Sequence, residues 1–114
     1  MARKRTPLLS TPPYPVETSL RRLGSNLRSA RLARNLKLDQ VAEKIGTGTR
    51  AVADAEKGRP GTAAAVYLAL LWAYDLMGPV SQLADPASDA VGLASIARRE
   101  RARASTHRDL DNDF

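Results

Sequence analysis

The sequence predicts an all-α protein. Several segments of its 114 residues place apolar side chains every three or four positions, as on one face of a helix. Glycine, proline or asparagine stands where each of these segments ends. No segment shows the alternation of apolar and polar residues that is typical of a strand. These three observations favour one small helical domain with an extension at each end.

Residues 1–17 precede the first helical pattern and are expected to form a flexible basic arm. Its prolines lack amide donors and push the residues before them into extended conformations. Three basic residues cluster at its tip: Arg3, Lys4 and Arg5. An arm of this kind either reaches into the minor groove of a duplex or is a tail that makes no defined contact.

A domain over residues 18–84 follows, and five helices are expected in it. Caps and breakers place them at about residues 18–35, 37–45, 48–57, 62–74 and 79–83. The hydroxyl of Thr18 or Ser19 can cap the first helix and that of Thr62 the fourth. Pro79 suits the first turn of the short fifth helix.

The segment 38–58 has the spacing of two short helices that meet at a tight turn. Ala42 is small enough for the helices to approach closely, and Gly46 can take the left-handed conformation that ends a helix. Val52 and Ala55 then share the inward face of the next helix. This spacing is typical of a helix-turn-helix, which places its second helix in the DNA major groove.

Residues 85–114 differ in character from the domain. Ser88 can cap a helix that includes Val91 and Ile96, and the strongly basic stretch ARRERARAS follows. The acidic end, DLDNDF, is expected to be disordered. The sequence therefore predicts a helical, basic tail whose last residues are not ordered.

Composition narrows the class of partner. The formal charge of +6 comes mostly from arginine, which pairs with phosphate through a bidentate fork, so it favours nucleic acid. A solvated basic surface would give the same charge. The chain has no cysteine, which fits a reducing cytoplasm. No apolar run is long enough to cross a bilayer, and none follows the basic N-terminus as in a signal peptide.

No catalytic, cofactor-binding or metal-binding set is found in the sequence. His107 is the only histidine and falls in the expected tail, and the serines have no adjacent base. The glycines at 46–48 belong to the turn between two helices rather than to a phosphate loop after a strand. No spacing suits a metal ion. We therefore expect a protein that is not an enzyme and that takes no small-molecule ligand.

Three stretches of the domain resemble the Cro/lambda-repressor helix-turn-helix family, also called XRE-type regulators. They are LGSNLRSARLARNL at 23–36, VAEKIG at 41–46 and AEKG at 55–58. The resemblance covers about residues 20–84 and implies a five-helix lambda-repressor-like DNA-binding domain. It also implies a largely buried ion pair between Arg31 and Glu56.

The stretch DPASDAVG at 85–92, with the basic tail after it, resembles a narrower group, the HipB-type antitoxins encoded beside HipA-like kinase toxins. That likeness implies an antitoxin that binds such a kinase and represses its own operon. The alternative is a protein-interaction module with weak, non-specific DNA binding. An RNA-binding protein is disfavoured, because no aromatic residues interleave the basic clusters.

If the helix at 48–57 enters the major groove, its outward residues Thr49, Arg50, Ala53 and Asp54 meet the bases. The fork of Arg50 matches the O6 and N7 acceptors of guanine. Asp54 either accepts from cytosine or pairs with a nearby arginine. Phosphate contacts are expected from four residues around this helix: Lys37, Gly48, Lys57 and Arg59.

Lys37 and Leu38 depart from the family pattern, which starts the second helix with a hydroxyl cap and a phosphate-binding glutamine. Either phosphate contacts, DNA shape and a dimer supply the binding, or the fold serves protein contacts and binds DNA weakly.

A homodimer is expected, because family members bind two half-sites about one turn apart. Leu68 and Trp72 lie four residues apart, so they share a helix face. An exposed Trp72 would anchor a dimer mate or another partner, whereas a buried one would fill the core. The candidate contact residues are Leu68, Trp72, Val80, Leu83, Val91 and Ile96.

Overall fold

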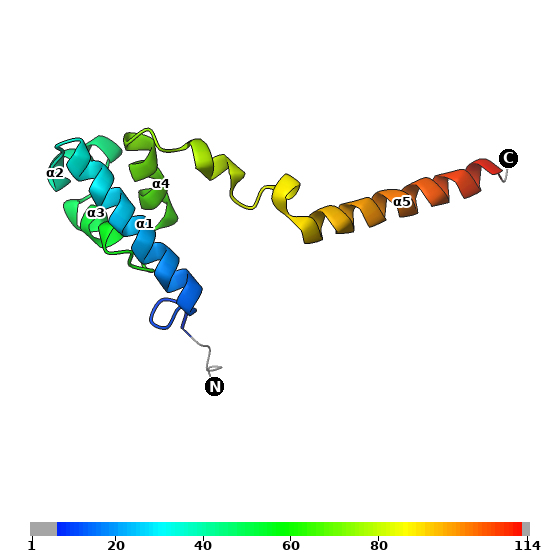
Figure 1. The fold of residues 1–114 in the computed structure, drawn as a ribbon, viewed down its shortest axis with the longest axis horizontal. Helices are drawn as coiled ribbons and strands as arrows, with labels where there is room; N and C mark the ends of the chain where they lie inside the picture. Colours follow the sequence, from blue (N-terminus) through cyan, green and yellow to red (C-terminus); the bar gives the residue numbers. More distant parts are fainter. Residues whose placement is uncertain (1–6, 113–114) are drawn as a thin grey trace. The chain divides into compact units, whose positions relative to one another are not determined.

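The computed structural model describes residues 7–112, and every regular element within them is helical. Five α-helices and two 3₁₀-helices follow one another along the chain (Figure 1): α1 (Tyr14–Ala33), α2 (Leu38–Ile45), α3 (Thr49–Glu56), α4 (Ala64–Ala73), η1 (Gly78–Gln82), η2 (Pro86–Ser88) and α5 (Ala90–Asn112). The predicted all-α class is confirmed. The chain divides into two compact units, one that ends at Met77 and one that begins at Gly78.

The first unit is a bundle of α1 to α4 around a small core. Helix α3 packs against both α1 and α2, and α4 packs against α2 and α3 (Figure 1). Aliphatic side chains and two tyrosines are removed from water at the centre of the bundle. The buried apolar residues are Leu27, Val41, Ala42, Val52, Ala55, Tyr67, Leu70 and Tyr74.

Helix α1 begins at Tyr14, four residues before the predicted start at Thr18, so the last part of the expected arm is helical. Pro13 precedes the helix and Pro15 stands in its first turn, where a missing N–H removes no intrahelical bond. Pro13 and Pro15 therefore mark the beginning of the helix, and the prediction that Pro15 lies in an extended arm is wrong. The Thr18 hydroxyl donates to the Tyr14 carbonyl at 2.9 Å and caps nothing.

Helix α1 crosses the end of α3 at two glycines. A β-carbon at Gly24 would lie 2.5 Å from the carbonyl oxygen of Ala55. Gly58 has a left-handed φ of 69°, and a β-carbon there would meet the backbone of Leu20 and Arg21. Only glycine fits at either position, and the two together let the backbones of α1 and the α3 end touch.

The cap predicted for α4 is wrong. Ala63 precedes the helix and no side chain caps it, while Thr62 lies in the loop before it. The Thr62 N–H donates to the Arg59 carbonyl at 3.2 Å, so Thr62 belongs to the turn that precedes α4.

The second unit contains η1, η2 and α5. The expected fifth helix is the 3₁₀-helix η1. The cap predicted at Ser88 is wrong, because the Gly92 N–H donates to Asp89 Oδ1 at 3.0 Å. Helix α5 continues to Asn112, beyond the point where disorder was expected. No glycine or proline follows Gly92, and the alanines and arginines of this stretch favour a helix.

Candidate nucleic-acid interface

The turn between α2 and α3 is closed by backbone hydrogen bonds. Gly46 has a φ of 78° in the left-handed region, where a glycine avoids the strain of a β-carbon. The Thr47 N–H donates to the Ala42 carbonyl at 2.9 Å, the six-to-one bond of a Schellman motif. Gly48 then precedes α3 as its N-cap. The turn therefore fixes the direction in which α3 leaves α2.

Helix α3 is held by its inward side chains and presents the opposite side to solvent. Val52 and Ala55 are both 0% exposed. Thr49 and Arg50 are exposed, and Ala53 and Asp54 are half-buried. These four residues form what we call the outward face of α3. It carries one unpaired cation, Arg50, which has no ion pair or side-chain hydrogen bond among the side chains described, those of residues 7–106.

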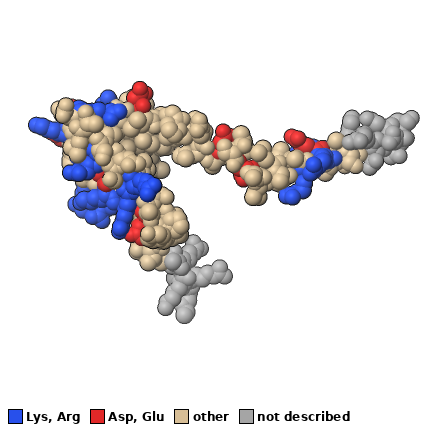
Figure 2. Space-filling view, viewed as in Figure 1, with Lys and Arg blue, Asp and Glu red and all other residues tan. Residues whose placement is uncertain are grey.

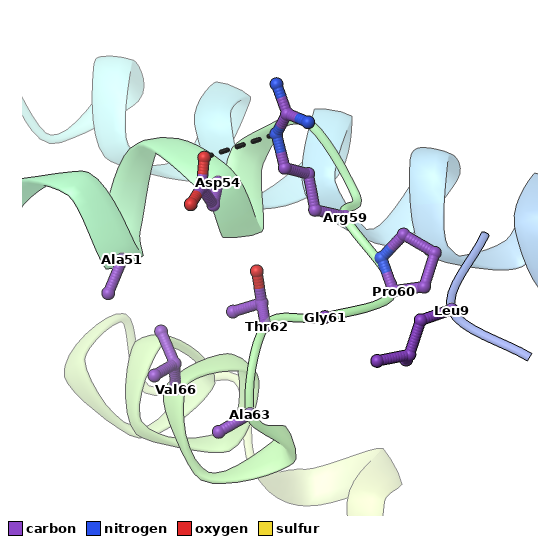
Figure 3. Close-up of a pocket in the computed structure, with 9 residues that line it drawn as sticks. All are labelled: Leu9, Ala51, Asp54, Arg59, Pro60, Gly61, Thr62, Ala63 and Val66. Carbon is purple, nitrogen blue, oxygen red and sulfur yellow. Dashed lines mark ion pairs between the residues drawn. The ribbon is translucent and has the colours of Figure 1, made fainter.

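Asp54 on this face pairs with Arg59 of the following loop. Arg59 Nε lies 3.2 Å from Asp54 Oδ1 (Figure 3). The Arg59 N–H also donates to the Asp54 carbonyl at 3.1 Å. Of the two interpretations of Asp54, pairing with a nearby arginine is the one that the free chain adopts.

Leu38 stands where the family pattern has a polar residue, and its side chain packs against the core. Gln40 supplies the bond that organises the start of α2, because its Oε1 accepts from the Lys37 N–H at 2.8 Å. This is one half of a capping box, since the lysine ammonium has no acceptor for the other half. Sequence reasoning missed Gln40, although a glutamine three residues after a candidate cap is a known signal.

The remaining phosphate candidates lie around α3. Lys37, Gly48 and Lys57 are all exposed. Gly48 stands where the first amides of α3 have no intrahelical acceptor, and Lys57 follows the last turn of the helix. The structure thus places them at the two ends of α3 and at the start of α2. Arg3, Lys4 and Arg5 of the arm lie outside the described residues.

Arg31 and Glu56 form the ion pair that ties α1 to α3. Arg31 Nε and Nη2 donate to the two oxygens of Glu56 at 2.6 and 3.0 Å, and Nη1 donates to the Leu36 carbonyl at 2.9 Å. The bond to Glu56 raises the pKa of Arg31 above its usual value. The side chains of Arg31 and Glu56 are both about nine-tenths buried. The bonds to Glu56 fix the position of α3 against α1, and the bond to Leu36 fixes the link between α1 and α2.

Apolar side chains are exposed on both units. On the first, Trp72 is 61% and Leu68 39% exposed, so the interpretation of Trp72 as a core residue is wrong. Helix α4 is apolar on every side, and its bundle neighbours cover only part of it. In the second unit Leu83, Val91 and Ile96 are exposed and Val80 is half-buried.

A hollow of about 540 Å³ lies between α3 and the start of α4 (Figure 3). Ala51 and Asp54 line it from α3, and Leu9 lines it from the segment before α1. Among the residues that the structure describes, Asp54 and Arg59 are the charged ones that line it. The sequence does not predict that Leu9 lies near α3, because the path of the segment before α1 depends on tertiary contacts.

Basic side chains gather on the first unit and again along α5 (Figure 2). Within the described residues, no three histidine, aspartate or glutamate side chains are grouped so that they could hold a metal ion. No helix in residues 7–112 has the length and apolar character needed to cross a membrane.

Two short helices joined by a glycine turn, with an exposed arginine on the second, define a DNA-binding helix-turn-helix protein. A family model described as "Helix-turn-helix domain" matches residues 22–84, more than half of the chain, so the chain belongs to this family. Comparison with curated proteins and with solved structures finds no match.

Proposed function

We propose that the chain is a transcriptional repressor that reads a double-stranded DNA operator through α3. The observation that carries the proposal is Arg50, an exposed and unpaired arginine in the first turn of α3, on the side away from Val52 and Ala55. The first turn is the part of a reading helix that meets base edges. Thr49 and Ala53 flank Arg50 and add a hydroxyl and a methyl contact.

Phosphate contacts set the position of α3 in the groove. Lys37 lies at the start of α2, and Gly48 and Lys57 lie at the two ends of α3, so these three bracket the outward face. Such contacts add affinity without sequence information. The outward face holds few polar groups, so a homodimer on two half-sites is part of the proposal, with Leu68 and Trp72 as its apolar contacts.

The test is a gel-shift titration with the duplex upstream of the gene and a shuffled duplex of the same composition. Arg50→Ala should lose about 5- to 150-fold in affinity for the upstream duplex, which corresponds to one good arginine–guanine pair. Arg50→Lys is the matched control. It keeps the charge and loses the fork, so it should bind the shuffled duplex like the wild type and still lose the preference.

Equal binding of the wild type to both duplexes would overturn the proposal and favour the alternative, a protein-interaction module with salt-sensitive, sequence-blind DNA binding. Unchanged preference in Arg50→Ala would remove Arg50 from readout.

The proposal extends to an antitoxin of an autoregulated operon with a HipA-like kinase partner. The likeness of residues 85–92 to HipB-type antitoxins supports it, as does the exposed apolar surface of α5, where Leu93 and Ile96 lie three residues apart. Full-length chain should capture the product of the neighbouring gene. Ile96→Asp should lose that capture and keep DNA binding, whereas Arg50→Ala should do the reverse. If the wild type and both variants all fail to capture the neighbouring gene product, the antitoxin role is contradicted.

A further inference from the structure

We infer that Asp54 and Arg59 act as one reading unit, in which Asp54 positions the Arg59 guanidinium for a base edge rather than for a phosphate. This inference rests on the proposed function, because it needs α3 in the major groove. It assigns Asp54 a positioning role and gives Arg59 a different role from that of Lys57, which lies two residues away.

Arg59 is held at three points. Its N–H donates to the Asp54 carbonyl at 3.1 Å, and its carbonyl accepts from the buried Tyr67 hydroxyl at 2.9 Å. Its Nε lies 3.2 Å from Asp54 Oδ1. The two hydrogen bonds fix the backbone of Arg59 between α3 and α4, and the ion pair draws its guanidinium toward Asp54, although the Arg59 side chain stays 60% exposed. A contact that only attracts phosphate requires no such constraint, since it carries no directional information.

The pairing with Asp54 leaves the two terminal nitrogens of the Arg59 guanidinium, Nη1 and Nη2, free to donate to a base. Asp54 faces the Nε side of the guanidinium, and Figure 3 shows the two terminal nitrogens of Arg59 pointing away from the carboxylate. Neither Nη atom has a partner among the side chains described, those of residues 7–106. Two parallel N–H groups at the end of a fixed side chain match the O6 and N7 acceptors of a guanine.

The Asp54–Arg59 pair also lies beside Arg50, the other residue proposed to contact a base. Asp54 follows Arg50 by four residues, so the two share a face of α3 and stand one turn apart. The guanidinium that Asp54 holds is therefore on the flank of the outward face, next to the side chain proposed to read the first base. Arg59 can then reach a neighbouring base pair of the same half-site.

The charge of Asp54 favours contact of Arg59 with a base over contact with a phosphate. Asp54 neutralises Arg59, so the pair adds little to counterion release, and the carboxylate repels a nearby phosphate. Lys57 has no such partner in the described chain and keeps its full attraction for phosphate. The pair thus supplies direction with little non-specific affinity, which is the combination that sequence discrimination needs.

The experiment begins with selection of duplexes from a random-sequence library by the wild-type full-length chain. The affinity for the selected duplex and for a shuffled duplex is then measured at several salt concentrations. Arg59→Ala should lose about 5- to 150-fold on the selected duplex. It should lose much less on the shuffled one, where the unpaired Asp54 carboxylate repels phosphate slightly, and its salt slope should stay close to that of the wild type. Lys57→Ala should weaken both duplexes alike and reduce the slope by about 0.9.

Asp54→Asn tests the positioning role. Release of the Arg59 charge should tighten binding to the shuffled duplex and steepen the slope by up to about 0.9, while the ratio of selected to shuffled affinity falls. Asp75→Asn removes the same charge from an exposed residue after α4 and should leave the ratio unchanged. Arg59→Lys, which keeps the charge and the fold, should lose the ratio as Arg59→Ala does.

Arg59→Ala that behaves like Lys57→Ala would make Arg59 a phosphate contact and overturn the inference alone. So would Asp54→Asn with an unchanged ratio. A wild-type chain that enriches no sequence would overturn the proposed function and this inference together.

Discussion

Glycine is required at position 24 because the backbone of α1 lies against the backbone of the α3 end there. A β-carbon there would meet the carbonyl oxygens of Ala55 and Glu56 at 2.5 and 2.7 Å, and neither can move without separating α1 from α3. Gly24→Ala should therefore lower the free energy of unfolding by about 1–3 kcal/mol, measured by urea denaturation followed by circular dichroism. Gly61→Ala is the matched control, because nothing lies within 4 Å of its added carbon. Equal effects of the two would contradict the argument.

Tyr74 and Tyr67 are two buried tyrosines with opposite expected responses to loss of the hydroxyl. The Tyr74 hydroxyl is buried without a hydrogen-bond partner in the described chain, and burial raises the pKa of this residue. Tyr74→Phe should keep or raise the free energy of unfolding, by up to about 1 kcal/mol. Arg34, 5.4 Å from the ring centroid, can still lie over the phenyl ring.

Tyr67→Phe is the counterpart. It removes a 2.9 Å bond to the Arg59 carbonyl and should lower the free energy of unfolding by about 0.5–1.5 kcal/mol. Thermal and urea denaturation of both variants give the comparison. A larger loss for Tyr74→Phe than for Tyr67→Phe is the result that would contradict it.

At the scale of elements, one buried charge holds α1, α3 and the α1–α2 link together. Glu56→Ala leaves the Arg31 guanidinium buried with only the Leu36 carbonyl as partner, so the free energy of unfolding should fall by about 3–5 kcal/mol. Glu17→Ala is the control, since its pair with Arg21 lies on the surface of α1 and contributes about 0–1 kcal/mol. If urea denaturation gave equal losses of unfolding free energy for Glu56→Ala and Glu17→Ala, the buried pair would stabilise the protein no more than the surface pair.

The elements differ in how far the sequence predicts them. The α2–turn–α3 unit was placed to within about a residue, because Gly46 and the inward spacing leave few other arrangements. The start of α1 is not predicted correctly, because prolines usually interrupt helices, whereas Pro15 lies in the first turn, where a helix tolerates it. Arg50 follows from helical periodicity alone. Pairing of Asp54 with some nearby arginine is one of the two interpretations that the sequence allows. The choice of Arg59 does not follow from the sequence, since the path of the loop depends on the distant hydroxyl of Tyr67.

For the whole molecule, the question is how copies of the chain associate, and within the first unit the outer side of α4 exposes the apolar side chains of Leu68 and Trp72. One tryptophan can bury about 150–250 Å², whereas a standard interface buries about 800 Å² on each partner. Leu68 and Trp72 are therefore too small a surface for a tight dimer by themselves. In the proposed complex, binding of two chains to neighbouring half-sites would supply the missing free energy, since DNA that binds only the dimer shifts the equilibrium toward it.

The expected result is a dimer that is weak in free solution and stable on DNA. Trp72 is the only tryptophan, so its fluorescence reports on the contact directly: emission should move to shorter wavelength as concentration rises, in step with sedimentation equilibrium. Trp72→Gln should remain monomeric, whereas Leu32→Gln, which alters an exposed leucine of α1, should dimerise like the wild type. Adding the selected duplex should lower the concentration at which the wild type dimerises. A wild type that binds this duplex as a single chain, with Trp72 emission unchanged, would contradict the dimer and leave α3 to read one half-site alone.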